Sequence, residues 1–209
     1  FIRARAAAGD KALGDYFLKS IQPFVWRRSL DFGQVANIRK MSGQIRDHYH
    51  KGQVLGPGYD LKRGRGGIRE CEFFAQAHQL IHGGRDPGLR MADTRKALAA
   101  LAERERIGAD EAETLSSAYQ LLRTIEHRLQ MLDDRQTHSL PENAADLHRA
   151  ARLHGLEDGE ALVALLEPVV TSVGAIYDGL AGEEDESTQR LADEGLPLED
   201  QLSALGYTD

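Results

Sequence analysis

A glycine-rich, basic stretch at residues 60–74 holds the residue types that could bind and orient an anion. Three of its glycines, which allow positive φ and close approach of the backbone to a ligand, are Gly64, Gly66 and Gly67. Four cations lie on or beside them: Lys62, Arg63, Arg65 and Arg69. A helix that begins at Gly67 or Ile68 leaves its first N–H groups without helical partners, and these donors and the helix dipole favour an anion. The stretch predicts an anion site, while an ordinary loop before a helix has the same composition.

The residue patterns of a catalytic or metal centre are not found in this sequence. Metal-dependent nucleotidyl transfer needs clustered carboxylates to hold the ion. The nearest approach to an Asp-x-Asp pair is Glu184-Asp185-Glu186, in an acidic run that reads as solvated chain. There is no zinc-type Cys/His spacing and no Walker loop. We therefore predict no catalytic residue and no metal ligand within these residues.

Charge is divided unevenly along the 209 residues. The net charge is −7, but residues 182–209 carry nine acids and one base, so the remainder is close to neutral. Residues 26–69 carry ten bases and three acids. This basic band is typical either of a surface that binds phosphates or polyanions or of a solvated helix face. The single cysteine, Cys71, excludes an internal disulfide.

Helical periodicity dominates the chain, and no segment shows strand-like alternation. We expect two short helices in residues 1–22, with Pro23 ending the second, and a long helix from Asp31. The loop would be followed by a helix over about 68–82. Further helices are expected from Asp93 or Thr94, from a capping box at Asp110–Glu113, over about 142–154, and from Asp158. This pattern predicts an all-α bundle of about seven or eight helices with no sheet.

Five segments resemble the sequence motifs of one family, the bifunctional glutamine synthetase adenylyltransferase/adenylyl-removing enzyme. They are Asp60-Leu-Lys-Arg-Gly-Arg-Gly-Gly-Ile-Arg-Glu-Cys-Glu-Phe73, Pro23–Phe32, Gln79–Arg90, Tyr119–Gln130 and Asp134–Pro141. The resemblance covers about residues 1–181 in the family's order, and it is greater to the amino-terminal, adenylyl-removing half.

The resemblance implies a division of the chain into four parts. Residues 1–30 would be the end of an upstream nucleotidyltransferase domain, and residues 31–181 the helical bundle that follows it. Residues 182–197 would be an acidic linker, and residues 198–209 the start of the next helical module. The chain does not begin with Met, so we expect it to be a piece of a longer polypeptide.

The activity that the resemblance implies belongs to that longer enzyme. It would be cytoplasmic and bacterial, a nucleotidyltransferase of nitrogen metabolism. One half removes AMP from an adenylylated tyrosine of glutamine synthetase by phosphorolysis, and the other adds AMP from ATP. The implied cofactors are Mg²⁺ with ATP, ADP and phosphate, and the implied regulators are the PII signal protein and glutamine. The piece itself, lacking the metal-binding carboxylates, is expected to be inactive and to hold no cofactor tightly.

Within such an enzyme the glycine-rich loop would face the active cleft. Lys62, Arg63 and Arg65, with the amides of Gly66 and Gly67, would then hold a phosphate. Arg69 and Glu70 either share this site or bridge the catalytic and helical domains, and the sequence leaves both roles open.

Two other interpretations stay open. One is the helical domain of a PII uridylyltransferase-like enzyme. The other is a non-catalytic module that binds protein or nucleic acid through the basic band, although the acidic end would oppose nucleic acid. A membrane partner is not expected, because no apolar run approaches the roughly 18–20 residues of a membrane span.

Overall fold

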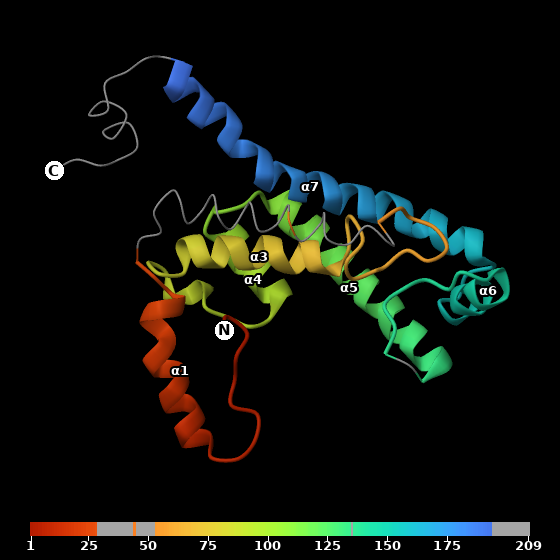
Figure 1. Ribbon diagram of the computed structural model, residues 1–209, viewed down its shortest axis with the longest axis horizontal. Coiled ribbons are helices and arrows are strands. Elements are labelled where there is room, and N and C mark those ends of the chain that lie inside the picture. Colours follow the sequence, from red (N-terminus) through yellow and green to blue (C-terminus); the bar gives the residue numbers. More distant parts are fainter. Residues whose placement is uncertain (29–43, 45–52, 135, 194–209) are drawn as a thin grey trace.

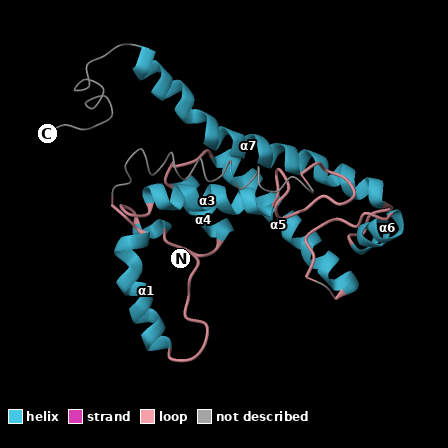
Figure 2. Ribbon diagram, viewed as in Figure 1, coloured by secondary structure: helices cyan, strands magenta, loops and turns pink. Residues whose placement is uncertain are grey.

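The computed structural model describes residues 1–28, 44, 53–134 and 136–193. Its described residues form six α-helices and one short 3₁₀ helix: α1 Lys11–Val25, α3 Ile68–His82, η1 Pro87–Leu89, α4 Thr94–Glu103, α5 Ala109–Asp133, α6 Ala144–Leu153 and α7 Gly159–Asp193. Figure 2 shows helices and loops without a strand in this part of the chain. The all-α class is confirmed, with fewer described helices than the seven or eight expected. The helix predicted from Asp31 lies outside the described residues.

Side-chain caps begin four of the described α-helices, and Asp10 of α1, Asp93 of α4 and Asp158 of α7 are at the predicted places. The carboxylate of Asp93 accepts from the Lys96 N–H at 2.9 Å, and that of Asp158 accepts from the Ala161 N–H at 2.8 Å. Asn143 caps α6 in the same way. These short polar side chains satisfy N–H groups that have no partner within the helix.

The start of α5 differs from its prediction. The expected capping box at Asp110–Glu113 is wrong, because the helix begins two residues earlier, with Gly108 as its N-cap. The Glu111 carboxylate accepts from the Gly108 N–H at 2.8 Å. Gly108 and Glu111 have the same three-residue spacing as the predicted pair, so the local pattern allowed both registers.

Two predictions near the amino terminus are also wrong. Residues 4–8 are not helical, and Pro23 lies inside α1 instead of ending it. Pro23 removes the N–H that would donate to the carbonyl four residues earlier, and the helix ends two residues after it, at Val25. The acidic segment from residue 182, which was expected to be a linker, begins as a continuation of α7 up to Asp193. Glu, Ala, Gln and Arg in this segment are good helix formers.

The bundle core lies where α3, α4, α5 and α7 pack together, with α6 against α7 and α5. In Figure 1, α7 runs along one side of the bundle and α1 projects away from the opposite side. One core cluster contains both ends of the glycine-rich loop, Leu61 and Ile68, packed with α5, α6 and α7. A second cluster contains Cys71 and Phe74 of α3 with residues of α4, α5 and α7. The loop is therefore built into the core at its base.

One segment, Gly159–Leu180 of α7, is long and apolar enough by length and composition to cross a membrane. Its inward residues Leu162, Leu166 and Val173 are fully buried among the other helices.

Candidate functional site

The glycine-rich loop is closed at its base by backbone hydrogen bonds. The Leu61 N–H donates to the His138 carbonyl at 2.8 Å, and the Leu140 N–H donates to the Tyr59 carbonyl at 2.8 Å. The Ile68 N–H donates back to the Leu61 carbonyl at 2.9 Å, so the two ends of the loop meet. Residues 62–67 therefore project from a fixed base.

Asp60 turns the chain into the loop. Its carboxylate accepts from the N–H groups of Lys62 and Arg63, both at 2.9 Å. Its carbonyl accepts from the Gly64 N–H at 2.7 Å. An aspartate that bonds the backbone two and three residues ahead favours such a turn. Asp60 was not predicted as a site residue, although this local signal was present in the sequence.

Gly66 allows the loop to touch α7. It has φ +76°, and a Cβ placed on it would lie 1.9 Å from the Val170 carbonyl oxygen. The Gly66 N–H donates to a carboxylate oxygen of Glu70 at 2.9 Å, and the Gly67 N–H donates to the Gly64 carbonyl at 2.9 Å. In this conformation both amides therefore donate to acceptors within the protein.

The Glu70 side chain is buried and turned into the loop. This places it apart from a surface that could meet another domain. Arg69 is half-buried at the start of α3, and its N–H donates to the Lys62 carbonyl at 2.9 Å. Of the two residues expected to share the phosphate site or bridge domains, Glu70 holds the loop through the Gly66 N–H.

The three cations expected to bind phosphate lie in one compact turn. Arg63 and Arg65 are exposed and Lys62 is half-buried. Arg65 pairs with Asp178 of α7 at 2.6 Å, and each side chain is 44% exposed. A surface pair of this kind contributes about 0–1 kcal/mol, so an incoming anion could compete with it at little cost. Asp178 was missed by the sequence analysis because it lies 113 residues from Arg65.

Tyr59 supports this turn from below. Its hydroxyl donates to the Arg65 carbonyl at 2.8 Å. Burial, followed by the nearby carboxylates of Glu70 and Asp60, raises the pKa of Tyr59 well above its usual value. The hydroxyl therefore stays protonated at neutral pH and remains a donor.

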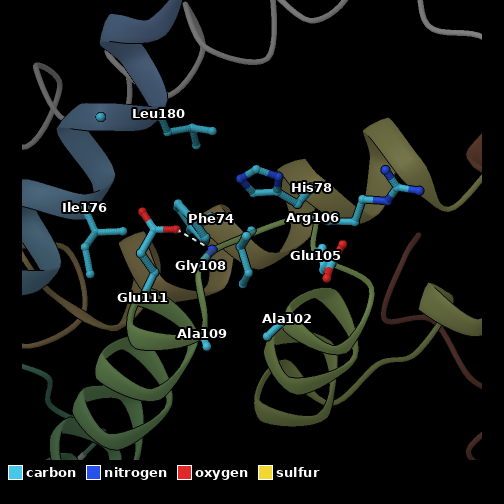
Figure 3. A pocket seen from close by; sticks show the side chains of 12 residues that line it. Phe74, His78, Ala102, Glu105, Arg106, Gly108, Ala109, Glu111, Ile176 and Leu180 are labelled. Carbon is cyan, nitrogen blue, oxygen red and sulfur yellow. Dashed lines mark hydrogen bonds between the residues drawn. The ribbon is translucent and has the colours of Figure 1, made fainter.

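A separate cavity of about 710 Å³ lies where α3, α7 and the turn between α4 and α5 meet (Figure 3). Phe74, Ile176 and Leu180 form its apolar wall, and the Glu111 carboxylate in it is the one that caps α5. No residue of the glycine-rich loop lines it. Among the residues that the structure describes, no group of three or more His, Cys, Asp or Glu side chains could hold a metal ion.

The comparison with protein families identifies the class of this all-α chain. The family model described as GlnD PII-uridylyltransferase matches residues 36–181, and the chain belongs to this family.

The most similar curated proteins found are more specific. Each is named bifunctional glutamine synthetase adenylyltransferase/adenylyl-removing enzyme. The protein of Agrobacterium fabrum is 45% identical over 184 residues, which are 88% of this chain and 19% of the relative. That of Rhodopseudomonas palustris (strain HaA2) is 42% identical over 212 residues, 99% of this chain and 22% of the relative. That of Xanthobacter autotrophicus is 42% identical over 218 residues, which cover 100% of this chain and 22% of the relative.

These relatives confirm the resemblance drawn from the motifs. The chain spans about a fifth of their length.

Proposed function

We propose that this chain is the helical region of a bifunctional enzyme that adds AMP to glutamine synthetase and removes it. In that enzyme it supports the adenylyl-removing site. The observation that carries the proposal is the loop at residues 60–70, in which three cations stand on a turn anchored to α5, α7 and the segment 138–140. The names and identities of the relatives support the parent activity.

In phosphorolysis, an oxygen of inorganic phosphate attacks the phosphorus of the tyrosine-bound AMP. The bond from that phosphorus to the tyrosine oxygen breaks, the tyrosine oxygen takes the proton that phosphate gives up, and ADP leaves. Two phosphates of like charge must approach each other for this step. The side chains of Lys62, Arg63 and Arg65 offset that repulsion, because each charge-assisted hydrogen bond contributes about 1.5–3 kcal/mol.

The loop does this through its side chains alone. Because the amides of Gly66 and Gly67 are engaged, Gly66 serves to bring the turn against α7, and Gly67 lets the carbonyls of Leu61 and Gly64 come close to its backbone. The carboxylates that would hold Mg²⁺, and the sites for ATP and ADP, belong to parts of the parent enzyme outside this chain. Glutamine synthetase, the PII protein and glutamine are its proposed partners, and the cytoplasm its proposed location.

Helix α1 supports the proposal that residues 1–30 belong to a neighbouring catalytic domain. None of its residues is buried, and three of its large apolar side chains, Leu13, Tyr16 and Phe24, are 64%, 70% and 66% exposed. An apolar face of this kind marks a surface that another domain covers. Arg3, just before α1, pairs with Glu72 of α3 at 2.7 Å and so links the two regions.

The proposal is tested in the full-length enzyme with the double variant Lys62→Ala/Arg65→Ala. We expect kcat/KM for phosphorolysis to fall about 100-fold or more, since two charge-assisted contacts are lost. AMP addition by the other half should not change. The matched control is Arg95→Ala/Lys96→Ala, which removes two exposed cations from α4, a helix that supplies no residue to the loop. Equal phosphorolysis by both variants would show that the loop is only structural.

A second candidate function follows from the description of the family model. A PII uridylyltransferase-like enzyme would modify PII instead of glutamine synthetase. Incubation of the full-length enzyme with each protein and with labelled ATP or UTP separates the two. Label on PII from UTP, with none on glutamine synthetase from ATP, would replace the first proposal with this one.

A further inference from the structure

The apolar stripe of α5 contains one carboxylate, Glu126. It is 1% exposed and lies one helical turn from both Leu122 and Leu129, which face the core. A buried carboxylate is costly unless its oxygens are paired. Arg123 donates to one oxygen, and Nδ1 of His138 lies 2.6 Å from the other. Because a carboxylate only accepts, His138 Nδ1 carries the proton of this contact.

His138 connects this pair to the base of the glycine-rich loop. Its side chain is held by α5, while its backbone carbonyl accepts from the Leu61 N–H at 2.8 Å. The next residue, Ser139, forms an antiparallel bridge with Asp60, and Leu140 exchanges backbone contacts with Gly58 and Tyr59. A second side chain of α5 also contacts this part of the chain: the Gln130 amide donates to the Thr137 carbonyl at 3.2 Å.

The contacts continue from the base to the cations. Tyr59, held between Gly56 and Leu140, donates its hydroxyl to the Arg65 carbonyl. Asp60, opposite Ser139, accepts from the amides of Lys62 and Arg63. A displacement of residues 138–140 would therefore move the residues that orient all three cations.

We propose that Glu126 and His138 are positioning residues for the glycine-rich loop. The Glu126 carboxylate holds the His138 ring against α5, so that residues 138–140 present their backbone to residues 58–61 and set where Lys62, Arg63 and Arg65 stand. That the placement of these three cations matters for phosphate binding rests on the proposed function. That Glu126 and His138 set their placement does not depend on it.

The test uses two substitutions whose amide nitrogens take the places of different nitrogens of the imidazole ring. In His138→Asn the amide nitrogen replaces Nδ1 and still donates to Glu126. In His138→Gln the amide nitrogen takes the place of Nε2, so the contact is lost. Hydrogen exchange is measured at the Leu61 and Leu140 amides, which form the base of the loop. The amides of Leu98 and Leu101 in α4, which are in other core clusters, serve as the internal control.

We expect His138→Gln to speed exchange at Leu61 and Leu140 by about 10-fold or more, since a hydrogen bond to a buried charge is lost. His138→Asn should stay within about 3-fold of the parent protein at these amides. The α4 amides should be unchanged in both. Unchanged exchange at Leu61 in His138→Gln, or an equal rise in α4, would overturn the proposal.

One measurement on the unsubstituted chain keeps the proposal testable if His138→Gln does not fold. The ¹⁵N shifts of the His138 ring report which nitrogen is protonated, and we expect a proton on Nδ1 at neutral pH. A bare Nδ1 would overturn the proposal. Titration of the chain with inorganic phosphate, followed at the Arg63–Arg69 amides, tests the proposed function separately. If phosphate gives no shifts while the exchange results hold, the phosphate role fails and the positioning role stands.

Discussion

The contact between the glycine-rich loop and α7 predicts that Gly66→Ala is among the most damaging small substitutions in the chain. At φ +76°, an alanine costs about 1–2 kcal/mol of backbone strain. Its Cβ would also meet the Val170 carbonyl carbon at 2.5 Å and its oxygen at 1.9 Å, and both are backbone atoms that move only with α7. Such overpacking costs about 1–3 kcal/mol. We therefore expect the free energy of unfolding to fall by about 2–5 kcal/mol.

Gly155→Ala is the matched control for this prediction. Gly155 has φ +84°, in the same left-handed region, but a Cβ there meets nothing within 4 Å. It should cost the backbone strain alone, about 1–2 kcal/mol. Urea unfolding of the chain and both variants, with m-values compared to check that the transition stays two-state, gives the two costs. Equal costs for Gly66→Ala and Gly155→Ala would refute the close approach of the loop to α7.

Three smaller effects follow from other contacts. Asp178→Ala should lower stability by at most about 1 kcal/mol, because its pair with Arg65 is at the surface, and urea unfolding measures this. Cys71 is buried, and burial first of all raises the pKa of its thiol, so Ellman's reagent should modify it only at the rate at which the chain opens. Burial, with two nearby arginines, lowers the pKa of His82 in the folded chain. As the pH falls, the His82 imidazole is therefore protonated in the unfolded chain before it is in the folded chain, and the free energy of unfolding should fall below about pH 6.5. His82→Gln should reduce the slope of stability against pH, measured by urea unfolding at several pH values. An unchanged slope would contradict the prediction.

Local signals predicted much of the fold. The expected helix over 68–82 matches α3 because glycines stand at both its ends and its apolar residues repeat at helical spacing. Asp93 and Asp158 begin their helices because a capping side chain acts within three residues. The capping box at Asp110 failed for a local reason as well. A Gly-x-x-Glu spacing occurs at the starts of both α3 and α5, as Gly67–Glu70 and Gly108–Glu111. In each, the glutamate accepts from a backbone N–H at the glycine N-cap or at the residue before it. The sequence analysis did not recognise this pattern.

Contacts between distant segments could not be predicted in this way. The sequence places Arg65 beside glycines, and that composition favoured an anion nest. The structure instead brings Arg65 to Asp178 and Gly66 to Val170, and both partners belong to a helix that begins more than 90 residues later. Likewise, the sequence analysis did not single out Glu126, although it is a carboxylate one turn from the apolar residues Leu122 and Leu129. Its partner His138 lies beyond the end of α5 and reaches it because the chain folds back along the loop.

The engaged amides change what kind of anion site the loop can be. A nest of free N–H groups binds an anion through dipoles fixed in the backbone, so its affinity would survive the loss of any one side chain. In this loop the N–H groups of Lys62, Arg63, Gly64, Gly66 and Gly67 all have acceptors within the protein. In the proposed phosphate site the attraction would then come mainly from side-chain charges at the surface, which salt screens strongly. A phosphate site of this kind weakens steeply with ionic strength and needs its cations held in place. That is why the anchoring of the turn by Asp60, Tyr59 and residues 138–140 matters as much as the cations themselves.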